Sequence, residues 1–262
     1  MMPSAVLALA PGAMAALLAV ALAAGIGITA VGPGGVLLTI GLYALTALPP
    51  ASVAGTGIVT NVATGLLGAA AYLRSGHLRA RHTRRTAILL SLAALPGTPL
   101  GIWLNGHTSR ASFGLLLGGL TLATGIMVAL RLRRTMPHAD AHPRLGDAGA
   151  TLLGFLVASV SGLFGLGGPM LAVPLLLAAG VPILPAIAAS QVQSVAISGI
   201  GAIGYAAHGA IDWPMAVLVG VPEMVGVVLG WQLARRLPAP VLAAALAAGL
   251  IALAPYLVWR SS

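Results

Sequence analysis

The sequence predicts an all-α polytopic membrane protein that consists of two inverted repeats. Three observations lead to this prediction: the composition, a succession of apolar segments, and a glycine-rich interruption that occurs twice. Of the 262 residues, 59% are hydrophobic and only 6% are charged, and the mean hydropathy is +1.03. Soluble domains carry about 25% charged residues. The composition therefore excludes a soluble domain and indicates a bundle of membrane-spanning helices.

The interruption in the second half of the chain runs from Gly162 to Pro169, inside an apolar region that extends from Leu152 to Leu177. Glycine costs roughly 1 kcal/mol in a helix interior relative to alanine, and proline suits the first turn of a helix. We therefore expect one helix to stop here and another to start at Pro169. In lipid, such a break is tolerated only where it is buried in protein or lines a wet cavity.

The same interruption occurs earlier in the chain, at Gly32–Gly35. A gapless alignment of the two halves that places Gly32 on Gly165 also pairs Pro49 with Pro182, Tyr72 with Tyr205 and Gly76 with Gly209. A slightly smaller shift pairs Gly97 and Gly101 with Gly226 and Gly230. The chain therefore contains two copies of one unit, each built around a glycine break, and this pattern indicates the binding site of a transporter.

The first copy is expected at residues 1–130. Its first segment, 11–47, is a helical hairpin that is broken at Gly32–Gly35 and followed by Pro49. The N-terminal residues 1–24 lack the basic region of a signal peptide, so we expect them to form part of the first transmembrane segment. The three spans expected after the hairpin cover residues 51–73, 86–104 and 112–130.

A polar connector, residues 131–147, separates this copy from the second one, residues 148–262. The second copy repeats the order of segments, which are a broken hairpin at 148–180 and spans at 185–207, 213–233 and 240–259. The stretches 36–47 and 169–180, which follow the two breaks, are short. An ordinary span needs about 20 residues, so we favour half-length helices in these two stretches.

The arginines predict the orientation in the membrane. The chain has 13 arginine residues and no lysine, and they lie in short loops, which is typical of topology determinants rather than of a nucleic-acid-binding surface. Loop 74–85 and the connector 131–147 are rich in arginine, whereas loop 105–111 has only Arg110. In the second copy the poor loop, 208–212, comes first and Arg235-Arg236 follow the next span. We therefore expect inverted copies, a cytoplasmic connector and two extracytoplasmic termini.

Each glycine break precedes a helix start, where free N–H groups and the positive end of the helix dipole favour an anion. A glycine turn adds backbone donors that no side chain covers. The alternative is that the small residues only allow tight helix packing, but their duplication in register favours a binding site. The candidate backbone donors are Gly32, Gly34, Gly35, Gly165, Gly167 and Gly168.

The span expected after each broken hairpin carries polar side chains that would orient the ligand. These candidates are Asn61, Ser190, Gln191, Gln193 and Ser194. Hydrogen bonding between helices is the alternative role, and it is common for serine. It is a weaker explanation for the three amides, which are costly to leave unpaired in hydrocarbon.

Glu223 lies near the middle of the span expected at 213–233. An ionisable group at membrane depth is a functional candidate, and we expect Glu223 to carry a proton that is coupled to substrate movement. The alternative is a glutamate near the outer interface or one paired with a neighbouring residue.

Other classes of function have little support in the sequence. It contains no Walker motif, Gly-x-Ser-x-Gly elbow or His-Glu-x-x-His motif, so we expect no enzyme activity and no cofactor. His77, His82, His138 and His142 lie in arginine-rich loops without a matching ligand set, so we expect no metal site. The expected partners are a small anionic substrate and the lipid bilayer. Nucleic acid is not expected, and a homodimer is left open.

The ordered set of motifs resembles the sulfite exporter TauE/SafE family of integral membrane permeases over residues 12–258. The motifs are the Gly-x-Gly-Gly breaks, the alanine-rich helices at Ala54–Thr60 and Ala188–Ser194, and the Tyr-x-x-x-Gly ends at Tyr72–Gly76 and Tyr205–Gly209. Pro33, and Gly57 in place of the more usual serine, depart from the family pattern. Glu223 is not part of that pattern.

The resemblance implies secondary, ion-coupled transport of sulfur-containing anions, such as sulfite, sulfonates, sulfoacetate or thiosulfate, across a bacterial inner membrane. We therefore expect a proton-coupled permease that works by alternating access at the paired breaks. Two alternatives stay open: a carrier or channel for a non-sulfur organic anion, and a non-transporting membrane scaffold.

Overall fold

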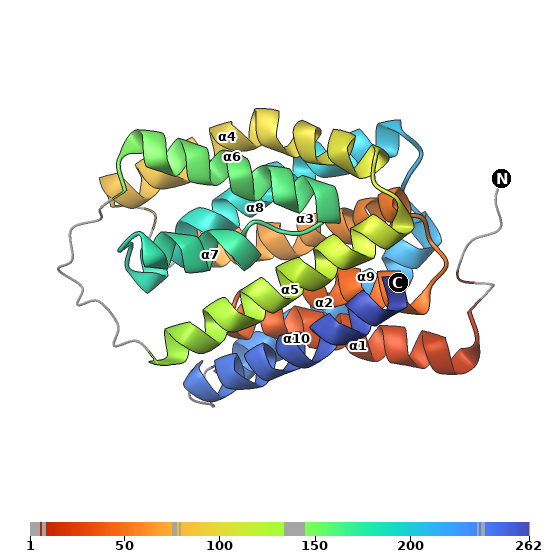
Figure 1. Ribbon diagram of the computed structural model, residues 1–262. Coiled ribbons are helices and arrows are strands. Elements are labelled where there is room, and N and C mark those ends of the chain that lie inside the picture. The colour runs from red at the N-terminus through yellow and green to blue at the C-terminus, as the bar shows by residue number, and fades with distance from the viewer. Residues whose placement is uncertain are drawn as a thin grey trace.

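The computed structural model describes residues 6, 9–74, 78, 80–133, 145–234, 236 and 239–261, and the regular elements in these ranges are all helices (Figure 1). They are α1 (Pro11–Ala30), α2 (Gly35–Leu45), α3 (Pro50–Arg74), α4 (Arg81–Gly106), α5 (Arg110–Arg133), α6 (Asp147–Phe164), α7 (Pro169–Ala178), α8 (Ile183–Ala207), α9 (Trp213–Ala234) and α10 (Ala239–Ser261).

The helices follow the expected order: a long helix, a short helix and three long helices, twice over. Seven of the described helices are long and apolar enough to cross a membrane, which confirms a polytopic helical membrane protein. The short helices α2 and α7 contain 11 and 10 residues. The helices before them, α1 and α6, contain 20 and 18 residues. Only the second arm of each broken hairpin is therefore half-length.

The arginine-rich loop at 74–85 is shorter than expected. Helix α4 begins at Arg81, ahead of the apolar segment that starts at 86. Arginine is a good helix former, so Arg81, Arg84 and Arg85 extend the helix beyond the apolar stretch. Other residues from the expected arginine-rich loops, 75–77, 79, 134–144 and 235, lie outside the described residues.

The long helices pack in a crosswise pattern. The fourth helix of each half lies against the first helix of the other half, so that α4 packs on α6 and α9 packs on α1. Helices α5 and α10 pack on each other along the lower front of Figure 1. The helices that follow the two broken hairpins, α3 and α8, pack together in the centre. The start of α1 and the end of α10 lie toward one end of the bundle, opposite the end of α5 and the start of α6 (Figure 1).

The glycine pairs noticed in the sequence make these crosswise contacts possible. A Cβ on Gly97 would lie 2.7 Å from Phe155 O, and one on Gly101 would overlap Ser159 O, both on α6. On α9, a Cβ on Gly226 would overlap Leu22 O, and one on Gly230 would lie 2.6 Å from Ile26 O, both on α1. Each pair therefore allows two helix backbones to touch.

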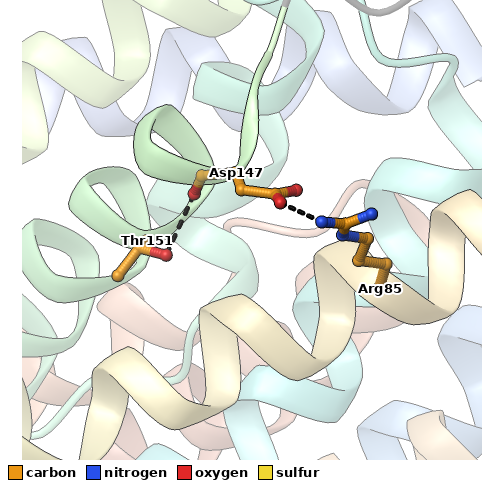
Figure 2. A network of polar contacts seen from close by, with 3 residues as sticks. All are labelled: Arg85, Asp147 and Thr151. Carbon is orange, nitrogen blue, oxygen red and sulfur yellow. Dashed lines mark hydrogen bonds and ion pairs between the residues drawn. The ribbon is translucent and has the colours of Figure 1, made fainter.

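Polar side chains satisfy the carbonyl groups left free at helix ends. Asn105 donates to Leu163 O at 2.7 Å, and Tyr205 donates to Gly162 O at 2.7 Å, so two helices hold the end of α6. At the other end of the bundle, Arg85 of α4 forms an ion pair with Asp147 in the first turn of α6 (Figure 2). Thr151 donates to Asp147 O at 3.0 Å (Figure 2). The end of α6 is thus held by two neighbouring helices, and its start is held by α4 and by a hydrogen bond within its own first turn.

Candidate functional site

Both helix breaks are closed by backbone hydrogen bonds that end the preceding helix. In the second break, Leu166 N donates to Ser161 O at 2.9 Å and Gly165 takes a φ of 71°. In the first break, Gly32 N donates to Gly27 O at 3.0 Å and Gly32 takes a φ of 111°. Such i→i−5 closure with a positive φ is a common glycine-based helix end. The two breaks are therefore ordered turns, as the glycine pattern predicted.

The two short helices start at these breaks without side-chain caps. Gly34 and Gly168 are the N-cap residues of α2 and α7, and neither helix has a side-chain cap hydrogen bond. Glycine offers no side-chain acceptor for the first N–H groups of a helix, which are left without an intrahelical partner. The starts of α2 and α7 therefore retain backbone donors for another group.

A small cavity lies between the two helix starts. Its volume is about 10 Å³, counted as the space open to the centre of a water molecule, which is room for about one water. The residues that line it are Ile28, Gly32, Gly35, Val36, Asn61, Thr64, Gly65, Leu166, Gly167, Pro169, Met170, Gln191 and Ser194. The lining therefore includes the first two residues of both α2 and α7, and none of its residues is charged.

Asn61 of α3 connects the two breaks and is 4% exposed. Its Nδ2 donates to Gly57 O at 2.9 Å and to Gly165 O, at the end of α6, at 3.2 Å. A Cβ on Gly35 or Gly167 would lie 3.5 or 3.3 Å from Asn61 Oδ1. Since Nδ2 faces two carbonyl oxygens, the hydrogen bonds fix the orientation of the amide. Oδ1 consequently lies on the cavity side, between the two breaks.

Gln191 and Ser194 line the cavity from α8, whereas Asn61 lines it from α3. Gln191 and Ser194 lie three residues apart, so they share one face of the helix, and they are 5% and 3% exposed. Ser194 Oγ would lie 2.9 Å from a Cβ on Gly167. The cavity thus gathers Asn61, Gln191 and Ser194 from two helices far apart in the sequence, together with glycines of both breaks.

Five of the predicted substrate-binding residues lie outside the cavity lining. Gly34 packs against the α1 backbone at Gly27, Gly165 packs against Ala54 of α3, and Gly168 packs against the α8 backbone at Ser190. Ser190 Oγ donates to Ile187 O at 2.9 Å, within its own helix. Gln193 Nε2 donates to Gly154 O of α6 at 3.0 Å. The contacts of Gln193 and of the three glycines are between helices, as the packing alternative describes.

The cavity also contains residues that the sequence analysis did not place in the site. Thr64 and Gly65 line it, and Thr64 Oγ1 donates to Asn61 O at 3.3 Å. The spacing i, i+3 and i+4 from Asn61 places them on its helix face, and this spacing was the available indication. The apolar residues, such as Leu166 inside the break, have no distinguishing sequence pattern.

Glu223 is fully buried on α9 and lies outside the cavity lining. Its two carboxylate oxygens have no hydrogen-bond partner in the described part of the chain. Its carboxyl group faces Thr60 of α3, the residue next to Asn61. The backbone of Glu223 contacts α1, where a Cβ on Gly25 would overlap Glu223 O. The carboxyl group is therefore buried within the bundle rather than at an interface with water.

No cluster of three or more metal-ligating His, Cys, Asp or Glu side chains occurs in the described ranges. Among the polar residues in the cavity, the amides and hydroxyls are neutral groups.

The matches to known proteins all indicate a membrane transporter. A family model described as "Sulfite exporter TauE/SafE" matches residues 17–260. A "Probable membrane transporter protein" from Xylella fastidiosa (strain 9a5c) is 31% identical over 236 residues, covering 88% of each chain. A protein of the same name from strain Temecula1 / ATCC 700964 is 30% identical with the same coverage. No solved structure matches the chain.

Proposed function

The chain belongs to the sulfite exporter TauE/SafE family of multi-pass membrane transporters, and we propose that it moves a small sulfur-containing oxyanion across the bacterial inner membrane. Sulfite or an organosulfonate such as sulfoacetate is the proposed substrate. The observation that carries this proposal is the cavity between the uncapped starts of α2 and α7. Two helix N-termini stabilise negative charge through their N–H groups and dipoles without any basic side chain.

The neutral lining supports transport rather than permanent binding. Gln191 and Ser194 would donate hydrogen bonds to anionic oxygens, which are weaker than ion pairs with arginine or lysine. A substrate held by neutral donors can leave again once the site opens. The proposed substrate-binding groups are therefore Gln191, Ser194 and the first-turn N–H groups of α2 and α7.

The small size of the cavity supports alternating access. Room for about one water is too little for an anion with three oxygens, so substrate entry requires the helices around the breaks to move apart. We propose that the two halves are inverted repeats, and that rocking of the broken hairpins opens the site to one side at a time. The crosswise packing of α4 on α6 and of α1 on α9 is what such a two-fold relation would produce.

Glu223 is the proposed proton carrier. A carboxyl group that is buried without a partner is stable in its neutral form, because an ionised carboxylate is costly to bury. Opening of the site would expose the group to water and allow it to release or accept a proton. Its position next to Thr60, one residue from Asn61, would couple this step to the cavity.

The test is radioactive sulfite flux into proteoliposomes, with and without a pH gradient. We expect saturable flux that the gradient accelerates, and we expect a smaller acceleration in Glu223→Gln. Gln191→Leu is expected to weaken sulfite binding about tenfold, the cost of about one hydrogen bond to a charged group. Unchanged affinity in Gln191→Leu would exclude this residue from the site.

The same preparation distinguishes the alternatives. Flux of carboxylates without flux of sulfite, sulfoacetate or thiosulfate would indicate a carrier or channel for non-sulfur organic anions. A folded protein that transports none of these solutes would refute the transport proposal and favour a membrane scaffold.

A further inference from the structure

The cavity contains one hydrogen-bond acceptor that the proposed anion site leaves unused. Both hydrogens of Asn61 Nδ2 are directed at carbonyl oxygens of Gly57 and Gly165. Asn61 Oδ1 lies on the cavity side, and no residue in the described part of the chain donates a hydrogen bond to it. Asn61 Oδ1 borders the cavity, so a bound solute that supplies a donor can pair with it, whereas a solute that presents only acceptors cannot.

The neighbours of Oδ1 are also those of the proposed anion site. Asn61 Oδ1 and Ser194 Oγ flank the same glycine, at 3.3 and 2.9 Å from a Cβ built on Gly167. A solute beside Gly167 would therefore contact both groups at once. Ser194 Oγ can donate or accept, whereas the carbonyl oxygen of Asn61 can only accept.

This arrangement separates two kinds of oxyanion. A fully deprotonated anion presents only acceptor oxygens, and one of them would face Asn61 Oδ1, which is repulsive and leaves Oδ1 unpaired. A monoanion that retains one O–H group can donate this hydrogen to Oδ1. Its other oxygens would then accept hydrogen bonds from Gln191, Ser194 and the starts of α2 and α7.

We propose that the cavity selects a protonated oxyanion, a monoanion with one O–H group, and that Asn61 Oδ1 accepts the hydrogen bond from this group. For sulfite, the selected species is bisulfite. This inference rests on the proposed function and narrows its substrate, because organosulfonates have no O–H group on sulfur at neutral pH. Asn61 is then the residue that determines specificity, and the proton on the ligand crosses the membrane with it.

The proton that distinguishes the two kinds of oxyanion is on the ligand and not on a residue that lines the cavity. No lining residue of the cavity in the described ranges is titratable. The ionisable side chain that faces α3 beside Asn61 is that of Glu223, which contacts Thr60 and is not part of the lining. The affinity for sulfite should therefore fall as pH rises and bisulfite loses its proton, in wild type and also in Glu223→Gln.

The test compares two ligands of equal charge and similar shape. Bisulfite has a hydroxyl group where methanesulfinate has a methyl group, and the binding of each ligand to the purified full-length protein is measured in nanodiscs. At a pH at which bisulfite predominates, we expect methanesulfinate to bind at least tenfold more weakly. A site built around a ligand O–H rejects an analogue without one because its own polar group stays unpaired.

Two variants make the comparison specific to Asn61. In Asn61→Leu the difference between the two ligands should disappear, whereas in Ser194→Ala both ligands should weaken by a similar factor and the ratio should persist. Equal binding of the two ligands to wild type would overturn this inference while leaving the proposed function intact. Binding of neither ligand to folded protein would overturn both. Because the wild-type ratio decides the question, the test does not depend on whether Asn61→Leu folds.

Discussion

The two halves of the molecule share one scaffold but differ in the chemistry placed on it. Aligning the two breaks places Ser194 of α8 at the position of Asn61 of α3, and both line the cavity. Aligning the glycine pairs of α4 and α9 places Ala94 at the position of Glu223, and both are fully buried. The packing positions are therefore alike in the two halves, whereas the polar positions differ. The polar groups that line the cavity and the buried carboxyl group are therefore not shared equally between the two halves.

The two breaks also differ in the contacts that support them. Gly165 packs against the backbone of α3 at Ala54, whereas a Cβ on Gly32 would meet no atom within 4 Å. Gly34 of the first break packs instead against α1, the other arm of the same hairpin. The far end of α2 is held by Arg110, which donates to Tyr43 O and Thr46 O at 2.8 and 2.7 Å and also to Leu48 O. The second break is thus held by a helix of the other half, and the first by its own hairpin and by Arg110.

The largest effect is expected from alanine at the break glycines. Gly165→Ala combines a positive φ with overlap on the Ala54 backbone, so we expect it to lower the free energy of unfolding by more than about 3 kcal/mol. Gly32→Ala has the unfavourable φ without the overlap and should cost about 1–3 kcal/mol. Thermal unfolding in detergent measures both variants. Equal losses would show that the turns are supported alike and would remove this difference between the halves.

The glycine pairs of α4 and α9 should respond alike, because both allow crosswise helix contacts. We expect Gly101→Ala and Gly230→Ala each to destabilise the protein by about 1–3 kcal/mol, the usual cost of overpacking. Gly119→Ala is the control, since a Cβ there meets no atom within 4 Å, and this variant should be neutral or slightly stabilising. A loss at only one of the two pairs would argue against a two-fold arrangement.

Arg110 provides a test of the contacts that hold the far end of α2. We expect Arg110→Ala to cost about 1.5–3 kcal/mol, because carbonyl groups at the end of α2 lose a charged donor. Arg110→Lys keeps the charge but not the forked geometry that reaches several oxygens, so it should recover only part of the loss. The unfolding midpoints of the three proteins provide the measurement. Full recovery by lysine would mean that the charge alone matters.

The smallest effect is expected at the ion pair that joins the starts of α4 and α6. The side chains of Arg85 and Asp147 are 62% and 53% exposed, and exposed pairs contribute about 0.2–1 kcal/mol. The same two alignments of the halves place Pro214 and Met14 at the equivalent positions, so the other crosswise contact lacks this pair. A double-mutant cycle with Arg85→Ala and Asp147→Ala should give a coupling within this range that decreases with added salt.

The helices and breaks could be predicted because their determinants are local. Apolar length defined the helices to within a few residues, and glycine followed by proline defined the start of α7 at Pro169. The start of α4 at Arg81 was missed, because helix propensity continued beyond the apolar segment that was used to place it.

The composition of the cavity could be predicted only in part, because it depends on contacts between distant helices. Gly34 and Gly167 occupy equivalent positions in the two breaks. Gly34 nevertheless packs against α1, whereas Gly167 lines the cavity. Gln191 faces the cavity and Gln193 faces α6, and their spacing of two residues already places them on different faces of the helix. Which glutamine and which glycine faces the cavity does not follow from spacing, because it depends on which neighbouring helix lies opposite.

The crosswise packing has a consequence for the synthesis of the protein. Helix α1 ends at Ala30, and its main partner α9 begins at Trp213. At the usual 5–20 residues per second, a ribosome needs roughly 10–40 s to make the chain between them. During that interval the face of α1 around Gly25 lacks the helix that covers it in the finished bundle. We therefore expect the first half to remain an unfinished intermediate in the bilayer, exposed to quality-control proteases until the last third of the chain has been inserted.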